Sequence, residues 1–172
     1  MRALPIAVAI LGLTLASCSK PAEEAKAPES AEAPEAAEAP EAEEAEEVTE
    51  AQKAALVAAL PAPYNGGDIA HGKQLFAVCK ACHTLVEGGA NMTGPNLWGV
   101  FGRKVAASTG FNYSDGMKAA TFSWDAAQMD KWIEKPSAMI TGTKMTYAGM
   151  KAPQDRIDLI AYLQSETSAP KE

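Results

Sequence analysis

The residues with the clearest chemical potential are Cys79, Cys82 and His83, which form the pattern Cys-x-x-Cys-His over residues 79–83. On one helical turn, two thiols at this spacing reach the two vinyl groups of a haem and form thioethers, while the adjacent imidazole binds the iron. The whole chain has only three cysteines and two histidines, so abundance does not explain the pattern. It therefore predicts one haem c, attached through Cys79 and Cys82, with His83 on the iron.

Two other readings of these five residues are weaker. A structural zinc site needs four ligands, and the chain offers only Cys18 and His71 as further candidates. A thioredoxin-like dithiol pair follows a strand in a βαβ unit, whereas residues 69–78 have the pattern of a helix. The motif thus favours haem over zinc or dithiol chemistry.

The N-terminal residues have the features of a lipoprotein targeting segment. Residues 1–17 carry one charge, and their apolar run is shorter than the roughly 20 residues that span a bilayer. The run ends in Leu-Ala-Ser-Cys, which resembles the lipobox of bacterial lipoproteins, where the cysteine becomes the lipidated N-terminus. We expect a signal peptide over 1–17 and a lipid on Cys18. The alternative is an ordinary signal peptide cut near Ala16.

Residues 18–63 are expected to be a disordered acidic linker that starts at the lipidated cysteine. Between 19 and 47 the sequence is almost entirely Ala, Glu and Pro, a composition that cannot bury a core. Residues 19–63 carry three lysines and twelve glutamates, so the net charge of −7 for the whole chain comes from the linker.

A short helix is expected within this linker, near residues 50–60. Thr49 and Gln52 match the Thr-x-x-Gln form of a capping box, good helix formers follow, and Pro61 ends the pattern. This helix would either cover part of the following domain or stiffen the linker.

Residues 64–172 are expected to form one domain. Asp68 is placed to cap a helix that runs from Ile69 into the haem motif. Helical periodicity returns over 125–135, and again from Pro153 to about Ser165. In the helix expected over 125–135, one side carries the apolar residues Met129, Trp132 and Ile133.

The remainder of this domain is predicted to be loop. Glycines and prolines interrupt residues 84–102, so this segment must wrap over a rigid scaffold, which a haem would provide. Signals for β-strands are negligible. The fold class is therefore all-α: a single domain of helices and long loops around one covalently bound haem.

Several further segments follow the haem motif in a characteristic order. They are Thr93-Gly94-Pro95-Asn96-Leu97, Gly99-x-Phe101-Gly102-Arg103-Lys104, Gly110-Phe111-x-Tyr113, Trp124, Gly142-Thr143-Lys144-Met145 and Asp158-Leu159-Ile160-Ala161-Tyr162-Leu163. In this order and spacing they resemble the class I cytochromes c, in particular the mitochondrial and alphaproteobacterial type. The likeness spans nearly all of residues 64–172 and implies the cytochrome c fold.

The resemblance implies a role for each matching residue. His83 and Met145 would be the two axial ligands of the iron, and the Pro95 carbonyl would accept the second ring N–H of His83. Polar donors would hold the buried haem propionate, because an unpaired buried carboxylate is costly. The haem environment would include Arg103, Tyr113, Trp124, Trp132 and Thr143, and the first and last helices would cross at Gly72, Phe76 and Tyr162.

The choice of Met145 depends on its context. Spacing alone would also allow Met139 or Met150, but the Gly-Thr-Lys-Met setting favours Met145. We call residues 79–83 the attachment turn. The second histidine, His71, is expected to be a helix-surface residue because it lies too near this turn to be the second ligand of the iron.

The expected function is electron transfer rather than catalysis. The resemblance implies a monomeric carrier that docks transiently with redox complexes, such as a quinol-oxidising bc complex and a terminal oxidase, and binds no nucleic acid. A positive patch around the haem edge would steer acidic partners, unless these lysines are merely scattered solubilising residues: Lys80, Lys104, Lys135, Lys144 and Lys151. We expect the protein on the periplasmic side of a bacterial membrane, lipid-anchored to the cytoplasmic rather than the outer membrane.

Two departures from the family pattern keep a second function open. Trp132 stands where many relatives place a tyrosine, and Thr141 replaces the proline that usually precedes Gly142. A weakly held Met145 would open the iron to peroxide or a diatomic gas, as in a haem-based peroxidase or gas sensor. A third hypothesis is that the acidic linker regulates docking by folding over the lysines.

Overall fold

The structure is a computed structural model, and it describes residues 48–168. The expected signal peptide, the lipid on Cys18 and most of the linker lie outside the described residues. The described residues belong to one compact unit, Glu44–Glu172. Within them the only β-structure is an isolated bridge between Lys104 and Ser123, which confirms the all-α fold class.

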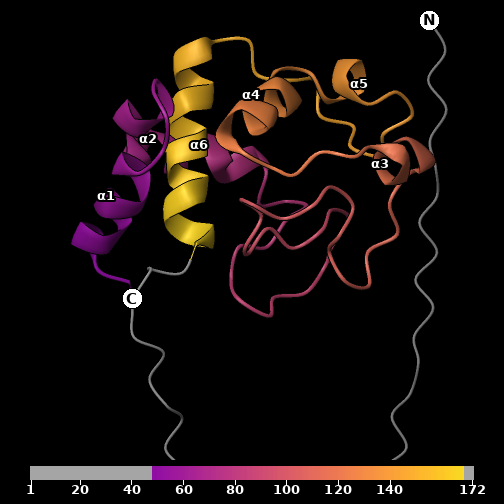
Figure 1. The fold of residues 1–172 in the computed structure, drawn as a ribbon, viewed down its shortest axis with the longest axis horizontal. Helices are drawn as coiled ribbons and strands as arrows, with labels where there is room; N and C mark the ends of the chain where they lie inside the picture. Colours follow the sequence, from indigo (N-terminus) through magenta and orange to yellow (C-terminus); the bar gives the residue numbers. More distant parts are fainter. Residues whose placement is uncertain (1–47, 169–172) are drawn as a thin grey trace, which may run out of the picture. The chain divides into compact units, whose positions relative to one another are not determined.

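Two helices pack across each other, with an N-terminal helix beside them and the helices that lie between these two in the sequence on the other side (Figure 1). They are α2 (Ile69–Leu75), which the 3-10 turn η2 (Phe76–Val78) continues, and α6 (Pro153–Thr167). Asp68 caps α2 by accepting a hydrogen bond from the His71 N–H at 3.0 Å, as expected. This pair of helices fixes the place at which the attachment turn begins.

The crossing is close because one residue has no side chain. A Cβ at Gly72 would lie 2.1 Å from the Asp158 carbonyl oxygen, so only glycine fits there. Next to it, the rings of Phe76 and Tyr162 pack with centroids 5.5 Å apart. The crossing predicted at Gly72, Phe76 and Tyr162 is therefore present.

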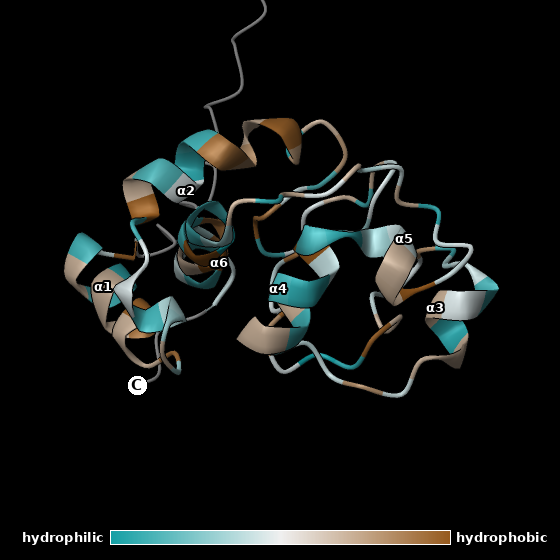
Figure 2. Cartoon of the chain, turned by 90° about the horizontal axis from the view of Figure 1, so that it is seen from above, coloured by the Kyte–Doolittle hydropathy of each residue, from teal (hydrophilic) through white to brown (hydrophobic). Residues whose placement is uncertain are grey.

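On the other side of α6 lies α4 (Ala126–Glu134) (Figures 1 and 2). Its N-cap is Asp125, whose carboxylate accepts a hydrogen bond from the Gln128 N–H at 2.7 Å. Met129, Trp132 and Ile133 are all buried on its inner face, as their spacing predicted. This helix contributes one wall of the space between the helices and the loops.

Three short elements were not predicted. They are α3 (Asp115–Ala119), α5 (Pro136–Met139) and the 3-10 turn η1 (Tyr64–Gly66). None has enough residues to produce a periodic apolar pattern, so the sequence carries no helical signal for them.

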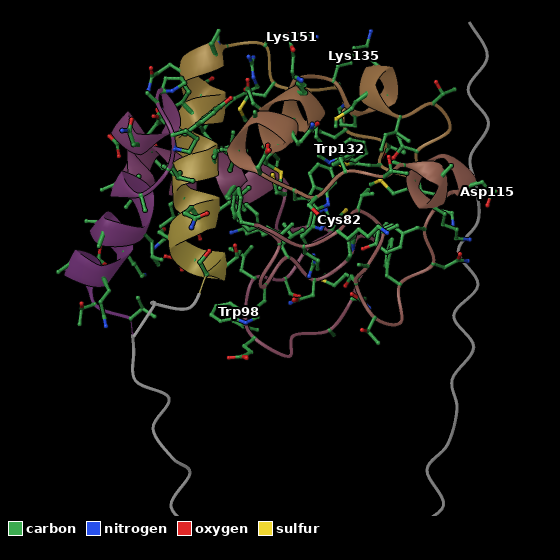
Figure 3. The ribbon with its side chains drawn as sticks, viewed as in Figure 1. Cys82, Trp98, Asp115, Trp132, Lys135 and Lys151 are labelled. Carbon is green, nitrogen blue, oxygen red and sulfur yellow. The ribbon has the colours of Figure 1, made fainter. Side chains whose placement is uncertain are left out.

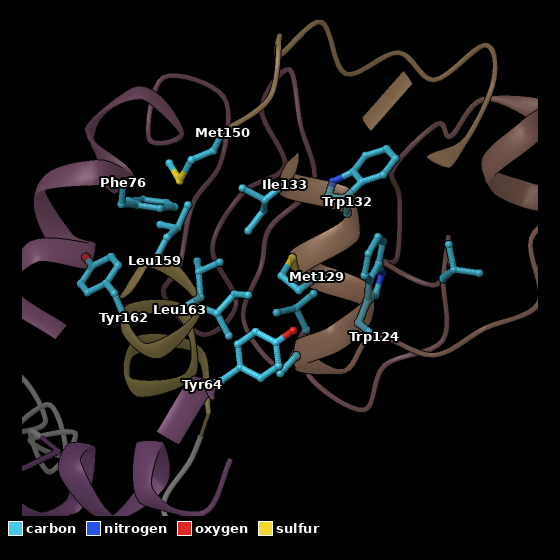
Figure 4. Close-up of a cluster of buried hydrophobic side chains, with 14 of the residues drawn as sticks. Tyr64, Phe76, Trp124, Met129, Trp132, Ile133, Met150, Leu159, Tyr162 and Leu163 are labelled. Carbon is cyan, nitrogen blue, oxygen red and sulfur yellow. The ribbon is translucent and has the colours of Figure 1, made fainter. Parts of the chain in front are cut away.

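Side chains from the helices and from the loops between them form one hydrophobic core (Figure 4). Its least exposed members come from α6, where Leu159 and Ile160 are at most 1 % exposed. The larger buried residues around them are Tyr64, Phe76, Trp124, Met129, Trp132, Ile133, Met150, Tyr162 and Leu163.

The predicted linker helix is present as α1 (Glu50–Ala58), with both hydrogen bonds of the capping box between Thr49 and Gln52. It packs against α6: Val57 is buried, and Lys53 Nζ lies 2.7 Å from Glu166 Oε1. This helix therefore covers the domain instead of only stiffening the linker. The compact unit extends N-terminally of Tyr64, the residue at which we expected the domain to begin.

Candidate haem site

The predicted site residues line a single cavity of about 300 Å³ between the helices and the loops. Cys79, Cys82 and His83 reach it from the turn after η2, and Met145 reaches it from the loop before α6. Cys82 and Trp132 both lie near the middle of the ribbon (Figure 3). The remaining predicted residues that line the cavity are Pro95, Arg103, Tyr113, Trp124, Trp132 and Thr143.

The attachment turn has a local helical geometry. The N–H groups of Cys82 and His83 both donate to the Cys79 carbonyl oxygen at 3.0 Å. Burial, with a smaller contribution from Cys82, raises the pKa of the Cys79 thiol to about 11. This thiol is therefore neutral where it lines the cavity. Within the part of the chain that the structure describes, no group of three or more His, Cys, Asp or Glu side chains could hold a metal ion.

His83 is oriented by a hydrogen bond and by close packing. Its Nδ1–H donates to the Pro95 carbonyl oxygen at 2.8 Å, which leaves Nε2 unprotonated and able to bind a metal. Burial lowers the pKa of His83, against the opposing effect of the Pro95 carbonyl, so the ring is neutral at pH 7. A Cβ at Gly94 would lie 2.4 Å from His83 Cε1, so the loop can cover the ring only with glycine at this position.

Aromatic residues with polar groups line the cavity. Tyr113, Trp124 and Trp132 are each at most 8 % exposed and line the cavity. Their hydroxyl and indole N–H groups make no hydrogen bond to any other residue in 48–168. Because no fully buried polar side-chain atom in these residues lacks a partner, these three groups are not fully buried. These groups are therefore free to donate to a polar group of a molecule held in the cavity.

Arg103 adds a positive charge to the same wall. Its Nη1 donates to the Trp98 carbonyl at 2.9 Å and its Nη2 to the Asn96 carbonyl at 3.0 Å. Burial lowers the pKa of Arg103, but a guanidinium stays charged in proteins. With Tyr113 and Trp124 it forms a donor set suited to a buried carboxylate. The thiols, the imidazole, the thioether and these donors fit a haem.

One hydrogen bond within the loop that carries Met145 and one to a neighbouring segment flank this residue. The Met145 N–H donates to Thr143 Oγ1 at 3.2 Å, and Lys144 Nζ donates to the Asn112 carbonyl at 2.7 Å. Of the alternatives from spacing, Met139 and Met150 do not line the cavity. Two other methionines that line it, Met117 and Met129, come from α3 and α4 and lie outside any predicted ligand motif.

The five candidate docking lysines are all exposed. Lys80 lies between the two cysteines, and Lys144 lines the cavity. Lys135 and Lys151 lie near the C-terminal end of α4 (Figure 3), while Lys104 forms the isolated bridge. Two of the five lysines are thus placed directly beside the cavity.

His71 lies on the surface of α2, as expected, but it has a buried partner that was not predicted. Its Nδ1 lies 2.8 Å from Asp158 Oδ2. Two other residues that the sequence reasoning missed are Asp130 and Arg156, which form an ion pair between α4 and α6. These partners are far apart in the sequence, so no local pattern connects them.

Comparison with known proteins gives a consistent result. The family model described as Cytochrome c matches residues 69–167. Cytochrome c2 of Rhodomicrobium vannielii is 44% identical over 113 residues, which cover 66% of this chain and 90% of that protein. Cytochrome c of Stellaria longipes is 43% identical over 105 residues, which cover 60% of this chain and 97% of that protein.

A solved structure agrees with this. Cytochrome cH from Methylobacterium extorquens superposes with a TM-score of 0.54 at 39% sequence identity, over 58% of this chain and 99% of that one. The matched segment includes the attachment turn, the residues that line the cavity and the crossing of α2 with α6. The chain belongs to the cytochrome c family, and its cofactor is one covalently attached haem c.

Proposed function

We propose that this protein carries single electrons between larger redox complexes while it is tethered to the periplasmic side of a bacterial membrane. The observation that carries the proposal is that His83, Met145 and the thiols of Cys79 and Cys82 line one cavity. When bound, the haem supplies an iron that alternates between the ferric and ferrous states. No substrate is chemically changed, so the protein is a carrier and not an enzyme.

The residues that line the cavity support this chemistry. His83, oriented by Pro95, and Met145 would occupy the two axial positions and exclude small ligands from the iron. A neutral thioether opposite an imidazole favours the ferrous state and raises the reduction potential. Arg103, with the hydroxyl and indole donors beside it, would neutralise a carboxylate that the fold buries.

Absorption spectroscopy tests this ligand set. The ferric protein should show the near-infrared charge-transfer band of a thioether ligand, and Met145→Ala should abolish it. Met139→Leu is the matched control, because Met139 does not line the cavity, and it should keep the band. A wild-type ferric protein without the band would refute Met145 as the ligand.

Docking would occur at the face where the cavity meets the surface. Lys80 and Lys144 lie beside the cavity and would attract an acidic partner. The contacts of an electron carrier are small and transient, so that each partner is released after transfer. By resemblance to the family, the partners would be a quinol-oxidising bc complex and a terminal oxidase, with the protein acting as a monomer.

A lipid on Cys18 would provide the tether. Among the helices of residues 48–168, none is long and apolar enough to cross a membrane. The lipobox-like segment before Cys18 supports a lipid anchor in the cytoplasmic membrane. A linker of this kind raises the local concentration of the carrier at its partners.

A Cys18→Ala strain tests the tether. The variant protein should leave the membrane fraction, and oxidase turnover by isolated membranes should fall. Undiminished turnover, with the variant still bound to the membrane, would contradict lipid anchoring.

A haem-based peroxidase or gas sensor is the second candidate function. It is favoured by Trp132, which lines the cavity and whose indole N–H makes no hydrogen bond to another residue in 48–168. A high-spin ferric spectrum, together with a spectral shift when CO is added to the reduced protein, would support it over the carrier.

A further inference from the structure

Arg156 is a buried cation on α6 that joins three parts of the unit. Its side chain is 9 % exposed, and its Nε donates to Asp130 Oδ1 on α4 at 2.5 Å. Its Nη1 donates to the carbonyl oxygens of Met150 and Lys151, at 3.1 and 2.9 Å. One guanidinium therefore connects α6 and α4 with Met150 and Lys151, which form the C-terminal end of the loop that carries Met145.

The same segment is also held from α4. The Met150 N–H donates to the Ile133 carbonyl at 2.9 Å, and the Met150 side chain is buried in the core (Figure 4). Gly149 has a φ of +102°, and a Cβ there would lie 2.1 Å from the Glu134 carbonyl oxygen. The chain is thus fixed on both sides at Met150, five positions after Met145.

The start of the loop packs through Ile140, which is buried in the core, and through the Thr141 carbonyl, which lies against Gly116 of α3, but its hydrogen bonds are fewer. The hydrogen bond from the Thr143 N–H to the Ile140 carbonyl is local, Thr141 is exposed, and Gly142 has a φ of +75°. Lys144 makes one exposed hydrogen bond, to the Asn112 carbonyl. The hydrogen bonds that join the loop directly to α4 and α6 therefore lie at its C-terminal end.

The ion pair is partly protected from water, with Arg156 as its buried partner. The Asp130 side chain is 26 % exposed, and the buried Tyr64 of η1 lies beside it. Burial and the Asp130 carboxylate raise the pKa of Tyr64, which reflects this proximity. Tyr64 precedes the residues that the family model matches, so part of this cover is supplied by the N-terminal extension. Removing one partner of such a pair leaves the other buried without a counter-charge.

We propose that Arg156 and Asp130 form a clamp that positions Met145 by holding the backbone of Met150 and Lys151. Neither Arg156 nor Asp130 lines the cavity, so both act as positioning residues. The inference rests on the proposed function, in which Met145 is the distal ligand. Opening of the clamp would release the loop and admit an external ligand to the iron.

The rate at which the ferric holoprotein binds cyanide measures this opening, because cyanide must take the place of the thioether. In full-length protein, Asp130→Asn should raise this rate on the order of tenfold or more, since breaking a buried pair is strongly destabilising. Arg156→Lys keeps the positive charge but loses the several N–H donors of the planar guanidinium. This variant should also bind cyanide faster than the wild type. Asp130→Glu keeps the carboxylate and should restore a rate near that of the wild type.

Val57→Ala is the control for general loss of stability, because Val57 is a buried residue of α1 and belongs neither to the clamp nor to the loop that carries Met145. It should lower the thermal midpoint and leave the cyanide rate unchanged. The clamp is refuted if Asp130→Asn and Arg156→Lys bind cyanide at the wild-type rate, or if Val57→Ala accelerates binding as much as they do.

The near-infrared thioether band separates this result from a failure of the proposed function. If the wild-type protein lacks the band, the assignment of Met145 fails, and the clamp fails with it. If the wild type has the band and the variants bind cyanide no faster, only the clamp is refuted.

Discussion

At the residue scale, the haem site depends on a histidine whose two ring nitrogens have different tasks. Nδ1–H of His83 is committed to the Pro95 carbonyl, so only Nε2 is available to a metal. The neighbouring Gly94 allows the loop to lie against the ring. Orientation and tautomer are therefore set by the protein before any electron is transferred.

Gly94→Ala should disturb this arrangement. The added Cβ would lie 2.4 Å from His83 Cε1, so either the ring or the loop must move. We expect a loss of about 1 to 3 kcal/mol in the free energy of unfolding and a lower yield of haem-loaded protein. Thermal melts and haem absorbance measure both effects. Gly66→Ala is the matched control, because a Cβ at Gly66 meets nothing within 4 Å, and it should leave both unchanged.

A second residue-scale feature is the contact between His71 and Asp158. Burial alone would raise the pKa of Asp158, but hydrogen bonds from His71, the Asp68 N–H and Gln154 outweigh it and lower this pKa. The hydrogen bond to Asp158 raises the pKa of His71, and the nearby carboxylates of Asp155 and Asp68 act in the same direction. The charged pair is thus favoured in the folded state.

This pair predicts how stability depends on pH. Because the folded pKa of His71 is raised, its stabilisation is complete below the unfolded value of about 6.5 and is lost as the pH rises through the folded value. The lowered pKa of Asp158 means that its contribution is lost as the pH falls below the unfolded value of about 3.9. The thermal midpoints of wild type and His71→Gln should therefore differ most between about pH 5 and 6.

Calorimetry of both proteins across this range and up to about pH 8.5 gives the comparison, in which the difference should shrink above the folded pKa of His71. Lys73→Gln, an exposed change on the same helix, should shift the midpoint equally at every pH. A difference for His71→Gln that does not vary with pH would contradict the role of the pair.

At the element scale, α1 is a helix that the family model does not include but that packs onto the domain. Val57 is 4 % exposed, and Leu60, which follows the helix, packs against the core. Lys53 pairs with Glu166 of α6, and its hydrogen bond to Glu166 raises the pKa of Lys53. The helix therefore supports α6, which in turn forms the crossing that places the attachment turn.

Val57→Ala in the full-length chain should lower the free energy of unfolding by about 2 kcal/mol, because two buried methyl groups are lost and a small cavity remains. Denaturant titration measures the change. The exposed Ala54→Ser on the same helix should cost no more than about 0.5 kcal/mol. Equal effects of the two substitutions would show that the packing of α1 contributes little.

At the scale of the whole molecule, charge is divided unevenly along the chain. Residues 64–172 hold eleven lysines and arginines and ten aspartates and glutamates, so they are close to neutral, while the acidic excess lies before them. Attraction between the lysines beside the cavity and an acidic partner would be local, because salt screens charges beyond about 8 Å at physiological ionic strength. We therefore expect the acidic segment to act as a spacer and not as a regulator of docking.

Deletion of residues 22–47 tests this expectation. The salt dependence of the second-order rate of electron transfer to an oxidase should be the same for the deletion variant and the full-length protein. Stopped-flow kinetics over a range of salt concentrations measures it. A steeper salt dependence after the deletion would indicate that the segment competes with the partner for the lysines.

Much of the helical framework follows from local signals. The Thr49 capping box, the Asp68 cap, the apolar spacing in α4 and the Pro153 start of α6 each act within a few residues, and each predicted a helix that is present. By contrast, α3, α5 and η1 are too short to produce a periodic signal. Spacing alone also left Met139 and Met150 open beside Met145. The Gly-Thr-Lys-Met setting favoured Met145, and in the structure Met145 is the one of the three that lines the cavity.

The sequence by itself determined the cofactor and predicted where it is attached, because Cys79, Cys82 and His83 lie on one turn, where residues close in the chain are also close in space. Only the tertiary structure decided that α1 covers α6, that Asp158 is the partner of His71, and that Arg156 meets Asp130 beside the end of the Met145 loop. The reason is physical: these contacts join residues of different elements, and their distances are set by how the helices cross and pack.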